Sequence, residues 1–136
     1  MYFDIISKTN SIYSGPCEKV ILKTKSGEIT ILDGHQNLIS SLDIGQIRYF
    51  VDGTENKVFS DEGFLEVATN KDETKVTVLA NRASIPSELF KEEIDRAVKA
   101  AEEEMTAKKG TISESVLIQL EKKIRYEKFL KDQAGL

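Results

Sequence analysis

The sequence has little of several features that would define its class at once. It contains one cysteine, two prolines and no tryptophan in 136 residues, and no apolar run approaches the ~20 residues of a membrane-spanning helix. We therefore expect no direct membrane insertion. The lone Cys17 excludes a disulfide within the chain and is typical of a reducing compartment. His35 is the only histidine, which excludes a site built from several imidazoles of one chain.

Basic residues are also fewer than acidic residues. The sum of 19 Lys and Arg against 23 Asp and Glu gives a formal net charge of −4. Nucleic-acid binding needs a basic surface, so we expect no nucleic-acid partner. The first residues, Met1-Tyr2-Phe3-Asp4, lack the basic segment and apolar core of a secretory signal. With 40% hydrophobic residues, the composition predicts a globular chain. The lone cysteine and the absent signal lead us to expect a chain that faces the cytosol.

Short runs of β-branched and aromatic residues fill the first 84 residues. We predict strands at 2–7, 11–14, 17–24, 28–32, 46–51, 57–60, 64–68 and 75–80. Turn-forming pairs such as Ser26-Gly27 and Asp52-Gly53 separate them. Short strands with no helix between them predict an antiparallel β-sandwich, or flattened barrel, over residues 1–84.

After Ser84 the apolar period becomes helical. Apolar residues three and four positions apart predict two stripes: Ile94, Val98, Ala101 and Met105 on one helix, and Val116, Leu117, Leu120, Ile124 and Leu130 on the next. Two helices of about 20 residues each would form an antiparallel hairpin over residues 85–136. The predicted fold class is therefore α+β, a β-sandwich followed by a two-helix hairpin.

The chain offers little of the chemistry of a catalytic site. Neither G-x-x-x-x-G-K-[ST] nor G-x-G-x-x-G occurs, so a standard nucleotide loop is missing. The paired carboxylates Asp61-Glu62 and Asp72-Glu73 fall in predicted turns, where solvated loop charge is the simpler interpretation. Cys17 begins a predicted strand and has no neighbouring ligand. We expect no catalytic residue, metal or cofactor, and a role in binding or structure.

One segment is more specific than composition. Residues 26–42 read S-G-E-I-T-I-L-D-G-H-Q-N-L-I-S-S-L, and residues 45–48 read G-Q-I-R. This segment resembles the epsilon subunit of the rotary F-type ATP synthase, which typically shows G-E-x-G-I-L-P-G-H-A-P-L-x-x-x-L and then G-x-x-R. Residues 63–67 and 76–80 resemble its G-G-x-x-E-V and V-T-V-L-A strands in the same order. Thr30, Asp33 and Asn37 depart from the family's Gly, Pro and Pro.

The resemblance implies a non-catalytic subunit of the central stalk, whose sandwich contacts the gamma subunit and the c-ring. Carried over by position, the expected partner-contact residues are Glu28, Leu32, Gly34, His35, Leu38 and Leu42. An acidic residue at a turn suits the basic loops of such a ring. The implied location is peripheral, on the cytoplasmic face of a bacterial cell membrane, within the ATP synthase complex.

The resemblance also implies a mobile hairpin whose last helix enters the alpha/beta catalytic head and restrains ATP hydrolysis. The second predicted helix suits two environments, because Ile118 and Phe129 lie roughly opposite its main apolar stripe. The residues that we expect to act in the head are Ile118, Lys122, Lys123, Arg125 and Phe129. A permanently docked hairpin is the alternative.

Some relatives bind ATP through an I/L-D-x-x-R-A motif in the first helix. Here Ile94-Asp95 begins the motif, but Val98 stands at the arginine position. Arginine is the side chain best suited to hold phosphate bidentately, so we expect weak or absent ATP binding. A different class of function is an adaptor whose sandwich docks an unrelated protein. An enzyme that uses His35 with carboxylates is disfavoured, because nothing in the spacing gathers them.

Overall fold

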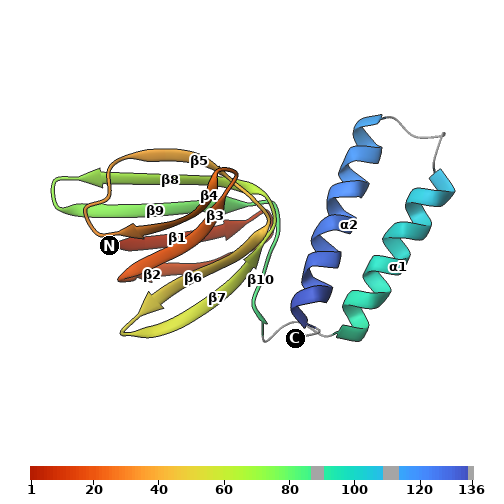
Figure 1. The fold of residues 1–136 in the computed structure, drawn as a ribbon, viewed down its shortest axis with the longest axis horizontal. Helices are drawn as coiled ribbons and strands as arrows, with labels where there is room; N and C mark the ends of the chain where they lie inside the picture. The colour runs from red at the N-terminus through yellow and green to blue at the C-terminus, as the bar shows by residue number, and fades with distance from the viewer. Residues whose placement is uncertain (87–90, 109–113, 135–136) are drawn as a thin grey trace. The chain divides into compact units, whose positions relative to one another are not determined.

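The computed structural model describes residues 1–86, 91–108 and 114–134. Its elements are β1 (Tyr2–Ser7), β2 (Ser11–Pro16), β3 (Lys19–Thr24), β4 (Gly27–Leu32), β5 (Leu38–Leu42), β6 (Gly45–Val51), β7 (Thr54–Ser60), β8 (Gly63–Asn70), β9 (Glu73–Ala80), β10 (Ala83–Ser84), α1 (Lys91–Lys108) and α2 (Glu114–Ala134). The chain divides into two compact units, Met1–Pro86 and Ser87–Leu136. The strands form the first unit and the helices the second (Figure 1).

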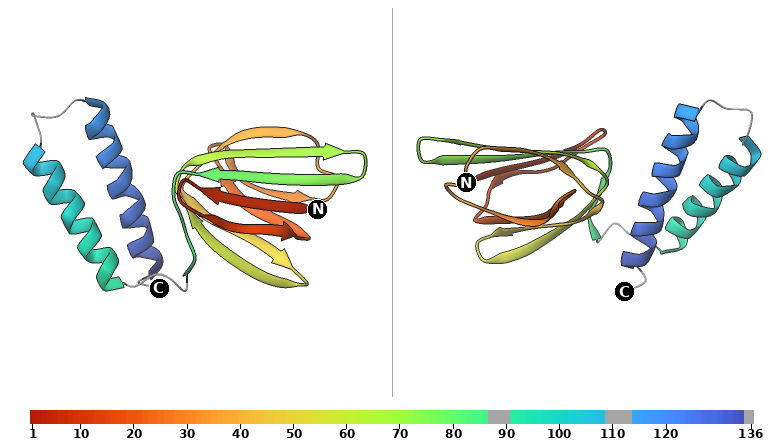
Figure 2. Two further views of the ribbon diagram at one scale, coloured as in Figure 1. Left: turned by 180° about the vertical axis from the view of Figure 1, so that it is seen from behind. Right: turned by 45° about the horizontal axis from the view of Figure 1, so that its top comes forward.

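The strands form one sheet that folds over on itself into two layers (Figure 2). The strand order is β10-β7-β6-β3-β5-β8-β9-β1-β2, and β4 pairs with the other edge of β3. Strand β3 pairs with β6 along its first half and with β5 only through Thr24 and Leu42, where the sheet passes from one layer to the other. One layer thus holds β4, β3, β6, β7 and β10, and the other holds β5, β8, β9, β1 and β2.

Alternating side chains from both layers fill the space between them. In β9 every second residue from Thr74 to Ala80 is buried, which is the period expected of a strand with one face on a core. The rings of Phe3 and Tyr49 come from opposite layers and lie 5.3 Å apart between centroids, and Tyr13 adds a ring 4.7 Å from Tyr49. The predicted sandwich, or flattened barrel, is confirmed.

Two details differ from the prediction. Strand β5 lies in a segment for which no strand was predicted. The sequence of Leu38–Leu42 shows no clear alternation of apolar and polar residues, and its extended form comes from pairing with β8. Strands β1 and β9 pair in parallel, whereas an all-antiparallel sheet was expected. No hairpin joins these two strands, since most of the sandwich lies between them in the chain, so no tight turn imposes an antiparallel direction.

The second unit is an antiparallel pair of helices (Figure 1). Ile94, Val98 and Ala101 of α1 and Ile124 of α2 are buried, as their spacing predicted. Two ion pairs cross between the helices: Lys128 Nζ lies 2.9 Å from Glu102 Oε1, and Lys131 Nζ lies 3.2 Å from Asp95 Oδ1. Val116, which was assigned to the packed stripe, is instead 42% exposed. It lies in the first turn of α2, at the end of the helix contact.

Candidate docking surfaces

The loop between β4 and β5, residues 33–37, is closed by a tight turn. His35 N donates to Leu32 O at 3.1 Å, and Gly34 has a φ of 85°. A positive φ at the third residue of such a turn is strained for residues with a side chain, so the turn requires glycine here. Gly34 therefore allows the chain to turn sharply at the end of β4.

The loop is also held by the hairpin of β8 and β9. Gly34 N donates to Thr74 Oγ1 at 2.7 Å, and Thr69 N donates to Asn37 Oδ1 at 2.8 Å. The hydroxyl of Thr69 donates to the carbonyl oxygen of His35. Three residues of a five-residue loop are thus fastened to two threonines of the neighbouring hairpin.

The expected contact residues around this loop differ in how available they are. Leu32 is 54% exposed and Gly34 is also exposed, whereas His35 and Leu38 are half-buried. Leu42 is 1% exposed and belongs to the hydrophobic core. It faces inward because it lies at the corner between the layers, which removes it from the candidate contact set.

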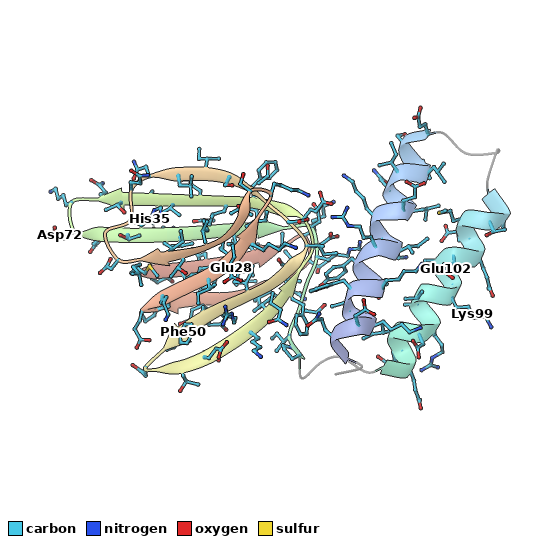
Figure 3. The ribbon with its side chains drawn as sticks, in the orientation of Figure 1. Glu28, His35, Phe50, Asp72, Lys99 and Glu102 are labelled. Atoms are coloured by element: carbon cyan, nitrogen blue, oxygen red, sulfur yellow. The ribbon has the colours of Figure 1, made fainter. Side chains whose placement is uncertain are left out.

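Glu28 lies apart from the loop. It is 65% exposed in its side chain and pairs with Arg48, whose Nη2 is 3.5 Å from Glu28 Oε1. Glu28 and Leu32 are four positions apart along β4, or about 13 Å. Figure 3 shows His35 toward the end of the sandwich that carries Asp72, with Glu28 nearer the middle. The candidate contact residues therefore form two separate groups rather than one cluster.

Arg48 sits between two carboxylates on the outer surface of β4, β3, β6 and β7. Its Nη1 lies 3.8 Å from Glu55 Oε1, in addition to the pair with Glu28. We call this surface the charged face, and its outward charged residues are Lys19, Lys23, Glu28, Arg48, Glu55 and Lys57. Most of its charges have a partner of opposite sign close by.

The outer surface of the other layer carries large apolar side chains. We call it the apolar face, defined by Ile6, Ile39, Phe64 and Leu79, which are 38%, 77%, 62% and 52% exposed. The register places Phe64 opposite Leu79, and Leu79 opposite Ile6, so three strands present one continuous row. A shallow groove of about 240 Å³ runs along this row. Such a contiguous exposed row is typical of a protein–protein contact.

A cluster of charges lies at the end of the sandwich where β5 meets β6. Lys25 Nζ is 3.1 Å from Glu62 Oε2 and 3.4 Å from Asp43 Oδ1, and Lys23 Nζ is 3.6 Å from Asp43 Oδ2. Burial alone would raise the pKa of Asp43, but the hydrogen bond from Ile44 N and the two lysines hold this pKa below its ordinary value. Burial opposes charge on Lys25 too, yet Glu62 and Asp43 raise the pKa of Lys25.

The chain's one thiol, Cys17, is buried in the sandwich. Burial raises the pKa of the Cys17 thiol, which favours its unreactive protonated form. Within residues 1–86, 91–108 and 114–134, no three His, Cys, Asp or Glu side chains are placed to hold a metal ion. Neither described helix is both long and apolar enough to cross a membrane.

The incomplete nucleotide motif begins at Ile94-Asp95. Its residues Asp95 and Val98 line a groove of about 500 Å³ between α1 and α2. Asp95 faces this groove and already pairs with Lys131. Val98, at the arginine position, also lines it but is 7% exposed and packs as part of the helix contact. Weak or absent ATP binding therefore stays a prediction.

The proposed regulatory residues of α2 have mixed exposure. Ile118 is 45% exposed, and Lys122, Lys123 and Arg125 are also exposed. Phe129 is half-buried and its ring stacks against Tyr126, with centroids 6.4 Å apart. Sequence reasoning treated Phe129 and Ile118 alike, but only Ile118 is a largely exposed apolar side chain.

Sequence reasoning missed the apolar face and the two threonines. One signal was visible, because Leu79 follows Lys75 and Thr77 on the polar side of its strand. The rest depended on register: nothing in the sequence pairs Phe64 with Leu79 or brings Thr74 to Gly34, 40 residues away.

Comparisons with protein families and with curated relatives indicate the same family. Residues 1–86 match the family described as the ATP synthase Delta/Epsilon chain, beta-sandwich domain. The chain is 40% identical to the ATP synthase epsilon chain of Desulfitobacterium hafniense (strain Y51), over 78% of this chain and 77% of that one. It is 35% identical to the ATP synthase epsilon chain of Thioalkalivibrio sulfidiphilus, over 80% of this chain and 76% of the other.

Solved structures show the same fold. A chain in the cryo-EM structure of the Euglena gracilis mitochondrial ATP synthase is similar with a TM-score of 0.68 and 22% identity, covering 96% of this chain and 79% of that one. A chain of the Tetrahymena thermophila mitochondrial ATP synthase central stalk and c-ring is similar with a TM-score of 0.54 and 13% identity, covering 96% of each. The chain therefore belongs to the family of ATP synthase epsilon chains, which are non-catalytic subunits of that complex.

Proposed function

We propose that this chain joins the rotor of an ATP synthase, with its sandwich contacting both the gamma subunit and the c-ring and thereby coupling them to the catalytic head. The observation that carries the gamma contact is the row of three exposed side chains within the apolar face, Ile6, Leu79 and Phe64, on adjacent strands. Removing such a row from water contributes about 25 cal/mol for each Å² of apolar area, and the costs of association offset part of this gain. The gamma subunit is the partner that family membership supplies.

The c-ring would be contacted by the loop 33–37, the adjoining end of β4 and Glu28. Gly34 of the loop and Leu32, the last residue of β4, are exposed there, and Glu28 presents a carboxylate that is 65% exposed. An exposed carboxylate orients a basic partner more than it tightens binding. Through these contacts the chain is peripheral to the membrane, on the cytoplasmic face in a bacterium.

The gamma contact is tested by copurification of the rotor with a Phe64→Glu variant. Phe64 is 62% exposed, so a carboxylate there leaves the core intact, but it places an unpaired charge inside the complex. We expect at least a tenfold loss of gamma binding. Thr54→Glu, which adds the same charge at an exposed position of β7, is the matched control. Equal binding by both variants would exclude the apolar face as the gamma contact and favour an adaptor for another protein.

We further propose that α2 inhibits ATP hydrolysis when it leaves α1 and enters the alpha/beta head. The supporting observation is a helix with Ile118 exposed beside basic side chains, which include Lys122, Lys123 and Arg125. Removing residues 111–136 from the assembled complex should raise ATP hydrolysis. Ile118→Ser in the full chain is the sharper variant, because this side chain is 45% exposed and the substitution keeps the rest of the hairpin in place. Unchanged hydrolysis with both changes would leave the hairpin without an inhibitory role.

A further inference from the structure

The hydroxyl groups of Thr69 and Thr74 lie between the β4–β5 loop and the rest of the sandwich. These residues are cross-strand partners in the hairpin of β8 and β9, and their Oγ1 atoms are 2.9 Å apart. Thr74 is 1% exposed. A hydroxyl buried to this degree needs hydrogen-bond partners, and both of its partners lead toward the loop.

Counting hydrogens fixes the direction of every bond in this cluster. Each threonine hydroxyl has one hydrogen to donate. The hydrogen of Thr69 goes to the carbonyl oxygen of His35, so the contact between the two hydroxyls uses the hydrogen of Thr74. Thr74 Oγ1 in turn accepts from Gly34 N at 2.7 Å. The chain therefore runs from Gly34 N–H through Thr74 and Thr69 to His35 C=O, beginning and ending in the same loop.

A fourth bond fastens the far end of the loop. Asn37 Oδ1 accepts from Thr69 N at 2.8 Å. The loop contains no proline, so its backbone has none of the intrinsic stiffness that a fixed φ supplies. Its conformation depends on the turn at Gly34 and on the bonds to the two threonines.

We propose that Thr69 and Thr74 are positioning residues that hold the loop 33–37 in the conformation that contacts the rotor. This inference rests on the proposed function, because the rotor contact of the loop is part of it. Bonds in a directed chain polarise one another, so breaking either link weakens the whole chain. The hairpin of β8 and β9 thus sets the shape of a loop that lies far from it in the sequence.

Two substitutions of Thr74 separate the hydroxyl from the methyl group. Thr74→Val keeps the shape and loses the hydroxyl, which leaves the Gly34 amide without its acceptor. Thr74→Ser keeps the hydroxyl and loses a buried methyl group. Both variants lower global stability, measured by urea unfolding of the full chain, but only Thr74→Val should release the loop.

Amide hydrogen exchange of Gly34, measured by NMR on the full chain, decides the inference. We expect about tenfold faster exchange in Thr74→Val and at most twofold faster exchange in Thr74→Ser. The double variant Thr69→Val/Thr74→Val should exchange no more than twofold faster than Thr74→Val, since one break already interrupts the chain. Equal exchange of Gly34 in Thr74→Val and Thr74→Ser would overturn the proposal.

A second readout separates this inference from the proposed function. Affinity for the gamma–c-ring rotor should fall about fivefold in Thr74→Val and recover in Thr74→Ser. Leu32→Ala, on the exposed edge of the loop, tests the rotor contact itself. If it and Thr74→Val both leave rotor affinity unchanged, the rotor contact of the loop is wrong, and the positioning role falls with it even where Gly34 exchange responds. If Leu32→Ala weakens binding while Gly34 exchange stays unchanged in Thr74→Val, only the positioning role is wrong.

Discussion

The two outer faces of the sandwich follow one alternation, but one carries a row of exposed apolar side chains and the other carries an arginine between two carboxylates. On the apolar face, Ile6, Leu79 and Phe64 continue one another across three strands. On the charged face, Arg48 bridges Glu28 and Glu55. Both faces are outward, so the core does not dictate either choice.

The difference shows which face gains from being covered. Charges that already pair with one another must lose water when a partner arrives, and the new contacts largely offset that cost. Exposed apolar side chains only lose unfavourable hydration. We therefore expect the apolar face to supply affinity for a partner and the charged face to orient it.

The largest expected effect comes from the glycine at the edge of the apolar row. A Cβ at Gly63 would lie 2.0 Å from Leu79 O, so Gly63→Ala must push β8 away from β9. We expect a loss of about 3 kcal/mol in the free energy of unfolding. Urea denaturation measures it.

Gly45 is the matched position in the layer that carries the charged face, because it is the first residue of β6 as Gly63 is the first of β8. A Cβ there would be 3.4 Å from the side chain of Lys23, which is an ordinary contact. Gly45→Ala should therefore stay within about 1 kcal/mol of the parent. An equal loss of unfolding free energy at Gly45 and Gly63 would contradict this. It would mean that any side chain at the first residue of a strand is destabilising, whether or not the neighbouring strand lies as close as β9 does to β8.

Much of the fold was predictable because period-two alternation is a local signal. β1 and β9 alternate over their whole length, and their positions follow directly. β5 was missed because Leu38 and Ile39 put apolar residues on both faces, so its strand form depends on β8. Local pattern fails where pairing between distant segments decides the structure.

The candidate sites were less predictable for the same reason. Position along a family motif led to Glu28 and His35 but did not show that they lie in two separate groups along β4 and the loop that follows it. Leu42 was included although the fold turns it inward. The roles of Thr69 and Thr74 come from contacts with residues more than 30 positions away, which no spacing rule detects.

The next largest effect should be an acid-dependent loss of stability at the charge cluster around Asp43. The pKa of Asp43 is lowered in the folded state, so its contribution is present above the unfolded pKa and is lost as pH falls through the folded pKa. Asp43→Asn should cost about 1 kcal/mol near neutral pH, mainly from the charge-assisted bond to Ile44 N and the exposed pairs with lysine. Urea unfolding across the acid range measures the difference.

The difference between Asp43→Asn and the parent should shrink below about pH 4, where the unfolded carboxyl takes up a proton. Asp72→Asn, in the exposed turn between β8 and β9, is the control and should change the acid profile little. A difference between Asp43→Asn and the parent that stays constant down to low pH would mean that shape, and not charge, sets the role of Asp43.

The smallest effect should come from the ion pairs of the charged face. Arg48 lies 3.5 Å from Glu28 and 3.8 Å from Glu55, and both carboxylates are more exposed than Arg48. Exposed pairs at such distances contribute little, so Arg48→Gln should cost about 0.5 kcal/mol at low salt and less at high salt. Lys57→Gln, at the cross-strand neighbour of Arg48, is the control for loss of one positive charge on this face. A cost above about 2 kcal/mol for Arg48→Gln, unchanged by salt, would mean that the charged face stabilises the sandwich itself, and the contrast between the two faces would then lie in stability as well as in docking.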